Sequence, residues 1–498
     1  MTQRKVIIIG AGIAGLSAGC YARMNGYDVT IFEMHDKPGG LCTAWQRKGY
    51  TIDFCIHHLA GSRSSSALYP IWQELGALRE QDMVFYDEFV RVEDAAGRSL
   101  IMYTDLDKLS EHMKELSPGD SKLIDQYIGL CRKSEKLELF ALPLLPPWKA
   151  AAAVLPLLPT MAKWGKVTME QFAGRFSDPF LQRAFPVIQY GLSDIPLLIN
   201  LNFMAGCAKR TLGWPAGGSL RFAQNIADRF TALGGRLAYK KRVSKIATAN
   251  GRVTGVRLQN GDYHDADIVI SAADGHSTIF DMLNGEYSSE RLIQYYTQAP
   301  KHCDMTVQVA LGVNRDMSQE PHALTVLLDE PVHIGGFPAD RLSVEVFNFD
   351  DTLAPTGRYV IKVPLSSRPA YWQALSLDRQ SYEEEKEKTA QTVIGCLEKR
   401  FPGLREQIEM IDVSTPLTVE RYTGNWQGYT APWLPPGGFA AATKGLSRTL
   451  PNLEGFYMAG QWGEGMIGIS TVAVAGRKII EMICKKDGRR FHTTSASQ

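Results

Sequence analysis

The feature that most constrains this chain is a glycine-rich turn between a short apolar run and a helix-forming segment near its start. Val6–Ile9 is apolar and rich in β-branched residues, as expected for a buried parallel strand. The residues that follow fit the pattern G-x-G-x-x-G with Gly10, Gly12 and Gly15. In this pattern the first glycine permits a tight turn, the second lets the backbone approach a pyrophosphate, and the third lets the helix sit close to the strand. The helix would direct its N-terminal N–H groups toward the phosphates.

An acidic residue completes this motif. Glu33 ends a second apolar run, DVTIFE, where its carboxylate can accept hydrogen bonds from an adenosine ribose. Strand, glycines, helix, strand and acid in register are far more specific than the glycines alone. A signal peptide is the competing interpretation because Arg4 and Lys5 precede an apolar run, but glycines break the run and no convincing cleavage site follows. The segment therefore predicts the first βαβ unit of a dinucleotide-binding domain.

The composition is that of an ordinary globular enzyme. The 498 residues predict two or more domains. With 54 Lys plus Arg against 53 Asp plus Glu, the net charge is +1, which gives no electrostatic case for nucleic acid as a partner. The eight cysteines show neither C-x-x-C nor zinc spacing, so we expect buried thiols in a reducing compartment and no metal site. The expected location is cytoplasmic, with peripheral contact to the inner face of a membrane as an alternative.

Residues 139–164 form an unusual apolar segment. Its five prolines rule out one long membrane-spanning helix. Two interpretations stay open. Short apolar helices flanked by tryptophan and lysine suit the membrane interface, and a buried helical lid over an apolar pocket fits as well. Both place an apolar ligand near this segment.

Several motifs occur in a recognisable order along nearly the whole chain. After the N-terminal GAGIAGLSAG and its acid come PGGLCTAW, GYTIDF, GWPAGGS, ADIVISAAD, GFYMAGQW and GMIGIS. This series resembles the phytoene desaturase and carotenoid isomerase family, within the larger group of FAD-dependent, amine-oxidase-like flavoproteins.

The resemblance implies FAD as the cofactor and assigns residues to it. Gly39, Gly40 and Leu41 would lie along the dinucleotide, and the backbone of Val243 would contact adenine. Gly460 would lie beside the ribityl chain, and a final helix beginning at Gly468 and Ile469 would direct its N-terminus at the flavin, where reduced flavin carries negative charge. The complete predicted set is Gly10, Ala11, Gly12, Ile13, Ala14, Gly15, Glu33, Met34, Gly39, Gly40, Leu41, Val243, Gly460, Gln461, Gly468 and Ile469.

The predicted fold is α/β, with a discontinuous Rossmann-like FAD-binding domain, a mixed α+β substrate domain and a helical apolar lid. ADIVISAAD should return to the first sheet as a buried strand, and the chain should form a hairpin around Asn250-Gly251. The expected ranges are 1–90, 205–285 and 415–490 for the FAD-binding domain, 91–204 and 286–414 for the substrate domain, and 488–498 for a flexible tail.

Three residues are candidates for catalysis. His57 and His58 stand where the family usually continues with small residues near the flavin face, and Glu464 follows the C-terminal glycine motif. FAD would carry the redox step, and the protein would supply orientation and a water-excluded pocket. The predicted function is desaturation, isomerisation or saturation of carbon–carbon bonds in a long apolar isoprenoid or carotenoid-like lipid. A flavin amine oxidase and a non-catalytic FAD-bound scaffold at a membrane remain alternatives, and the sequence leaves the oligomeric state open.

Overall fold

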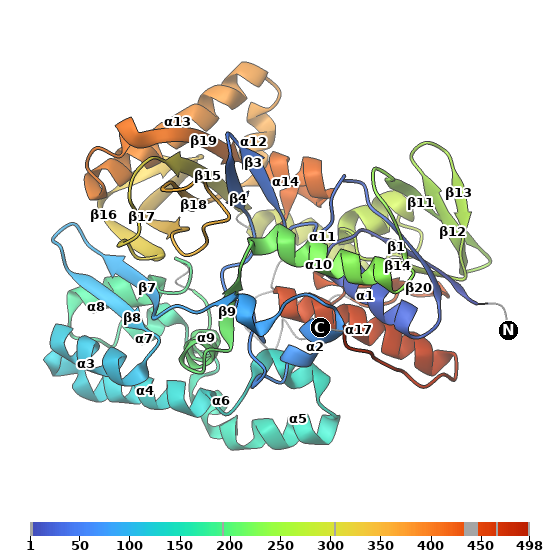
Figure 1. Ribbon diagram of the computed structural model, residues 1–498, viewed down its shortest axis with the longest axis horizontal. Helices are drawn as coiled ribbons and strands as arrows, with labels where there is room; N and C mark the ends of the chain where they lie inside the picture. Colours follow the sequence, from blue (N-terminus) through green and yellow to red (C-terminus); the bar gives the residue numbers. More distant parts are fainter. Residues whose placement is uncertain (1–2, 192–193, 303–304, 433–446, 465–466, 497–498) are drawn as a thin grey trace.

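A parallel sheet of five strands carries the glycine-rich turn (Figure 1) in the computed structural model, which describes residues 3–191, 194–302, 305–432, 447–464 and 467–496. Its strands, in spatial order, are β10 (Arg236–Ala238), β2 (Asp28–Phe32), β1 (Lys5–Ile9), β14 (Ile268–Ser271) and β20 (Phe456–Met458). All neighbouring pairs are parallel, and the strand order reverses between β1 and β14. Ligands of such sheets bind beyond the carboxyl ends of the strands at this reversal. The predicted return of ADIVIS to the first sheet is confirmed.

Two helices cross the reversal point together. α1 (Ile13–Met24) and α17 (Ile469–Lys486) lie side by side (Figure 1). They pack so closely that a Cβ atom on Gly476 would lie 2.6 Å from the Ala14 carbonyl oxygen. Sheet and helices enclose α1, and almost every residue of its first three turns is buried, which explains why its sequence is small or apolar on all sides. A third helix, α10 (Gly218–Ala232), also packs on α1.

A larger, seven-stranded sheet forms a separate layer. Its order is β19 (Ile408–Ser414), β15 (Met305–Val313), β18 (Tyr359–Ser367), β17 (Phe337–Val346), β16 (Ala323–Ile334), β7 (Glu88–Glu93) and β8 (Ser99–Tyr103). Within this sheet, β16 and β7 form the one parallel pair among the described strands. Helices α12 (Pro369–Leu375) and α13 (Arg379–Arg400) contribute to the core beside this sheet. The predicted α/β class is confirmed. β7 spans residue 90, the predicted domain boundary, and the domain ranges stay a prediction.

Helices pack against the β7–β8 edge of the larger sheet around a second core. They are α3 (Leu106–Leu116), α4 (Ser121–Ser134), α7 (Met169–Ala173), α8 (Pro179–Ala184) and α9 (Leu197–Ala208). A short 3-10 turn, Pro118–Asp120, separates α3 from α4. The apolar segment follows α4 as a 3-10 turn at Leu139–Leu144, α5 (Pro147–Val154), a 3-10 turn at Leu155–Leu157 and α6 (Leu158–Trp164).

Short elements connect these layers. The predicted hairpin is confirmed, since β11 and β12 pair antiparallel on either side of Asn250-Gly251. The remaining strands are β3 (Ala44–Arg47), β4 (Tyr50–Asp53), β5 (Leu59–Ala60), β6 (Met83–Val84), β9 (Leu212–Pro215), β11 (Val243–Ala249), β12 (Arg252–Leu258) and β13 (Tyr263–Asp265). The remaining helices are α2 (Tyr69–Glu74), α11 (Glu290–His302), α14 (Pro416–Thr423) and α16 (Gln461–Glu464).

The described part of the C-terminal tail, up to residue 496, lies along the first domain. The flexibility expected for residues 488–498 stays a prediction. The Phe491 ring lies 5.8 Å from Tyr21, and the His492 N–H donates to Asn25. The Ala496 N–H donates to the carbonyl of Gln73. A partly buried aromatic ring and backbone hydrogen bonds hold the described tail, and its polar composition did not reveal them.

Candidate functional site

A cavity of about 1380 Å³ opens at the reversal point of the parallel sheet and extends to the larger sheet. This volume exceeds the roughly 300–1,000 Å³ of a pocket for one drug-sized ligand. Every predicted cofactor residue except Ala11 and Gly15 lines it, and so do His57 and His58. The structure therefore brings residues from both ends of the sequence to one space.

The glycine-rich turn forms one wall of the cavity from backbone alone. Gly10 has a φ of +95°, and a Cβ on Gly15 would lie 2.1 Å from the Gly10 carbonyl oxygen. A Cβ on Gly12 would meet only the Gly39 oxygen, at 3.8 Å, so it would project into open space. α1 begins after Gly12 with no side-chain cap and no acid in its first turn. Its first N–H groups are thus available to an anionic ligand.

Glu33 lies next to this turn and is buried. Its carboxylate accepts hydrogen bonds from the Ala11 N–H at 2.7 Å and from the His35 N–H at 2.8 Å. A carboxylate has further lone pairs, so it can also accept a hydroxyl of a ligand in the cavity. The Lys241 N–H donates to the Glu33 carbonyl, which brings Val243 to the same wall.

The C-terminal motif forms the opposite wall. Gly460 has a φ of +93°, and a Cβ there would lie 3.0 Å from the Ala14 side chain. α17 begins after Gly468 without a side-chain cap or an acid in its first turn, so a second helix N-terminus borders the cavity. The Gln461 amide donates to the Thr430 carbonyl at 3.2 Å. The side chain of Glu464, the third catalytic candidate, lies outside the described residues.

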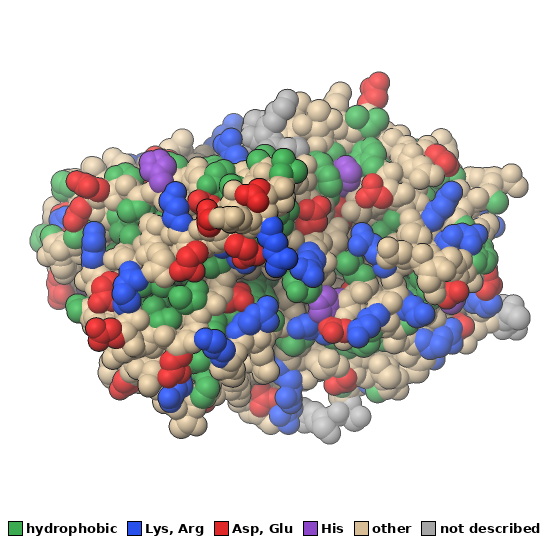
Figure 2. All heavy atoms as spheres, turned by 90° about the horizontal axis from the view of Figure 1, so that it is seen from above, with side chains coloured by type: hydrophobic (Ala, Val, Ile, Leu, Met, Phe, Trp, Pro, Cys, Tyr) green, Lys and Arg blue, Asp and Glu red, His purple; other side chains and the backbone are tan. Residues whose placement is uncertain are grey.

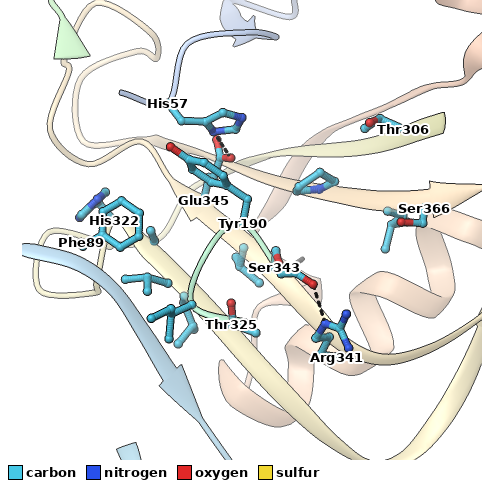
Figure 3. Close-up of a pocket in the computed structure, with 18 of the residues that line it drawn as sticks. His57, Phe89, Tyr190, Thr306, His322, Thr325, Arg341, Ser343, Glu345 and Ser366 are labelled. Carbon is cyan, nitrogen blue, oxygen red and sulfur yellow. Dashed lines mark hydrogen bonds and ion pairs between the residues drawn. The ribbon is translucent and has the colours of Figure 1, made fainter. Parts of the chain in front are cut away.

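At the larger sheet, His57 and Lys362 line the cavity, and Glu345 pairs with both of them. The His57 imidazole Nδ1 lies 2.6 Å from one oxygen of Glu345 on β17. The other Glu345 oxygen lies 2.7 Å from the Nζ of Lys362 on β18, which also donates to the Asp53 carbonyl. Burial alone would raise the pKa of Glu345, but the imidazole and the ammonium outweigh burial and hold it at about 2. Glu345 is therefore a fixed carboxylate that orients His57 (Figure 3).

His58 lies in a different environment from its neighbour. Its Nδ1 is 3.2 Å from the Tyr190 hydroxyl, and its ring packs against Phe89. Burial, with smaller contributions from His322 and His57, lowers the pKa of His58 to about 3. His58 is thus neutral near pH 7, whereas His57 is held by a carboxylate, so the two histidines do not form an equivalent pair.

Glu345 and Lys362 are the residues that the sequence analysis missed. Lys362 interrupts the apolar run YVIKVPL, and its side chain is only 1% exposed. A lysine within a buried strand is a signal of a buried ion pair. The sequence gives no comparable signal for its partner. Asp53, by contrast, accepts hydrogen bonds from the Ser219 N–H and hydroxyl, as expected for a residue that fixes its loop.

The described part of the chain contains no group of three or more His, Cys, Asp or Glu placed to hold a metal ion. None of its helices combines the length and apolar character needed to cross a bilayer. On the face shown in Figure 2, basic and acidic side chains are interspersed.

The chain is similar to several known proteins. Residues 8–75 match the family model of an NAD(P)-binding Rossmann-like domain. A chloroplastic prolycopene isomerase of Daucus carota is 26% identical over 487 residues, which cover 93% of this chain and 78% of the isomerase. A lycopene-forming phytoene desaturase of Pseudescherichia vulneris is 26% identical, covering 83% of this chain and 86% of the desaturase. The 4,4'-diapolycopene oxygenase of Methylomonas sp is 27% identical, with coverage of 97% and 98%.

The resemblance to the phytoene desaturase and carotenoid isomerase family is confirmed. The prediction that the chain is an enzyme resembling this family is confirmed with it. A solved structure of a putrescine oxidase triple mutant superposes with a TM-score of 0.61 at 15% identity, covering 97% of this chain and 99% of that structure. That likeness shows that the chain shares the fold of this structure.

Proposed function

We propose that the protein is an FAD-dependent enzyme that acts on carbon–carbon bonds of a long apolar isoprenoid, by desaturation, isomerisation or saturation. One observation carries the proposal, namely that the backbone cradle for a dinucleotide and an apolar region lie in one continuous cavity. That apolar region is lined by Leu139, Phe140, Ile195, Ile199 and Phe203. An apolar chain bound there would share the space with the cofactor.

The residues present fit FAD. Gly12 leaves room beside the N-terminus of α1, where a pyrophosphate would receive N–H groups, and Glu33 would hold the ribose. The predicted positions along the rest of the cavity remain a proposal. When bound, FAD supplies hydride acceptance or return at its N5 atom. The protein residues bind and orient the two partners.

We assign the proton-handling role to His57. Its Nδ1 is fixed by Glu345, so its Nε2 is left to hold or release a proton at the substrate. Glu345 is a positioning residue for His57, and Lys362 balances the Glu345 charge. The substitution Glu345→Gln should lower kcat by about 10²-fold, the lower end for acid–base catalysis, and shift the acidic limb of the pH–rate profile. An unchanged pH profile would remove His57 from this role. The catalytic role of Glu464 stays a prediction.

Anaerobic mixing tests the function. An isoprenoid polyene should bleach the oxidised flavin band if the reaction is desaturation. If it is isomerisation, pre-reduced enzyme should convert a cis polyene to its trans form without net change in the flavin. Bleaching by diamines but not by polyenes would favour the amine oxidase. No change with either class would favour the non-catalytic scaffold.

We also propose that residues 139–164 contact a membrane. Leu139 and Phe140 line the cavity, whereas Trp148 and Leu155 are 69% and 64% exposed. α5 and the turn that follows it contain no buried residue, so this part does not form a buried lid. The segment, at the lower edge of the molecule in Figure 1, thus joins the cavity to an apolar surface, as a lipid substrate requires.

Vesicle flotation tests this contact. The double substitution Trp148→Ser and Leu155→Ser should reduce the fraction that floats with liposomes of mixed neutral and anionic lipids. Leu377→Ser is the matched control, because Leu377 is 91% exposed outside the segment. Equal flotation of all three proteins would exclude the membrane role.

A further inference from the structure

A second cavity, here called the side pocket, adjoins the main one. Its volume is about 340 Å³, and it shares His57, His58 and Tyr190 with the wall of the main cavity. Figure 3 shows Tyr190, His322 and Glu345 around this space. A long ligand in the main cavity can therefore place one end in the side pocket.

The side pocket is aromatic, yet it contains unpartnered polar atoms. His322 stacks on Tyr86 with ring centroids 3.7 Å apart and planes 10° apart. The rings of His58 and His322 lie 6.5 Å apart, so they border the same space. Among the described residues, the buried Nε2 atoms of both histidines have no hydrogen-bond partner. Buried polar atoms are normally satisfied, so two orphaned nitrogens facing one pocket point to a polar ligand group.

The backbone around this pocket is held in an uncommon conformation. Tyr190 has a φ of +54°, which is rare for an aromatic residue, and its hydroxyl pairs with His58. The Arg341 Nε donates to the Gly191 carbonyl and ties this turn to β17. Because the Tyr190 hydroxyl can either donate to His58 Nδ1 or accept from it, His58 Nε2 can donate to or accept from a ligand.

Charge decides what kind of polar group the pocket accepts. Burial lowers the pKa of His58 to about 3 and that of His322 to about 4, so both are neutral near pH 7. Each neutral imidazole offers one donor and one acceptor. Arg341 is the one Arg or Lys among the described lining residues, and it is already paired with Asp340. The Glu345 carboxylate on the same wall opposes a second anion.

We infer that the side pocket binds the oxygenated end, a hydroxyl or a carbonyl, of the isoprenoid chain that occupies the main cavity. This rests on the proposed function and narrows its substrate from a pure hydrocarbon to a polyene with a neutral polar terminus. A site built to hydrogen-bond an oxygen discriminates against an analogue that lacks it, because its own polar atoms then stay unpaired.

Equilibrium binding to the oxidised, flavin-loaded protein tests the inference without any turnover. The probes are all-trans-retinol, all-trans-retinal, all-trans-retinoic acid and the hydrocarbon in which hydrogen replaces the hydroxyl of retinol. We expect the alcohol and the aldehyde to bind about tenfold more tightly than the hydrocarbon, and the acid to bind most weakly at pH 7.5. Wild-type protein alone suffices for this comparison.

Variants assign the preference to the pocket. His322→Phe keeps a ring against Tyr86 but removes the nitrogen, so it should abolish the preference for the alcohol without weakening hydrocarbon binding. The control is His276→Phe, since His276 stacks on Trp426 outside both cavities. Equal affinity of wild type for alcohol and hydrocarbon would overturn the inference, as would a preference that survives His322→Phe. If hydrocarbons still bleach the flavin in that case, the proposed function stands. If no polyene binds, both fail.

Discussion

The two ends of the main cavity are built from different materials. At the parallel sheet, the wall consists of backbone: glycines without side chains and two uncapped helix N-termini. At the larger sheet, the wall consists of side chains from separate segments, with His57, Glu345 and Lys362 linked in a row. The first wall has fixed partial charges that do not titrate. The second depends on buried ionisable groups whose charges balance one another.

Because of this difference, the two ends of the cavity are sensitive to different substitutions. The backbone wall tolerates no added atom where a ligand approaches, but its electrostatics barely respond to pH. The side-chain wall tolerates changes of shape better than changes of charge, because one missing partner leaves a buried charge uncompensated. The following predictions test this contrast in order of expected effect.

The largest effect is expected at Gly12. Its φ of −67° suits alanine and a Cβ would meet nothing closer than 3.8 Å, so Gly12→Ala should change the free energy of unfolding by less than about 1 kcal/mol. The same methyl group should displace the pyrophosphate and remove nearly all bound flavin. Gly15→Ala, in contrast, should lower stability by about 1–3 kcal/mol through overpacking against Gly10. Flavin absorbance and urea denaturation measure the two effects, and full flavin content in Gly12→Ala would contradict the backbone cradle.

A smaller but clear effect is expected at Lys362. Lys362→Met should lower the free energy of unfolding by about 3–5 kcal/mol, because Glu345 would lose a buried cation. Lys388→Met is a matched control, since Lys388 pairs with Glu385 on the surface and is 70% exposed. It should change stability by less than about 1 kcal/mol. If urea denaturation gives the same loss of unfolding free energy for both variants, the buried ion pairs of Glu345 contribute no more to stability than a surface ion pair.

The smallest effect concerns acid stability. His58 and His322 have folded pKa values of about 3 and 4, below the ordinary value of 6.5, so the unfolded chain binds protons first as pH falls. Their contribution to stability is complete above pH 6.5 and declines toward pH 4. The decline is at most about 1.4 kcal/mol per pH unit for each histidine.

The contribution of Glu345 to stability is lost at a lower pH than that of the histidines. Its pKa of about 2 lies below its ordinary value of 4.5, so its contribution is lost between pH 4.5 and 2. His322→Phe should therefore flatten the stability curve between pH 6 and 4.5 and leave its lower part unchanged. Urea denaturation at several pH values measures this slope, and parallel curves for both proteins would contradict the buried neutral state of His322.

The same contrast explains what the sequence could predict. The backbone wall leaves a local trace, because glycines at fixed spacing, apolar strands and Glu33 stand in register within one βαβ unit. The side-chain wall leaves little trace, since Glu345 and His57 lie almost three hundred residues apart and meet only through tertiary packing, while the register of the larger sheet places Lys362 opposite Glu345. The sequence shows Lys362 as a charge within an apolar run, but it gives no such signal for its partner Glu345. The docking of Phe491 depends in the same way on tertiary packing.

The flavin content of the purified protein tests the central claim most directly. Nucleotide released by denaturation should be FAD, at about one molecule per chain after reconstitution, because the cradle between α1 and α17 is complete in this chain. A colourless protein that takes up no FAD on reconstitution would contradict the account.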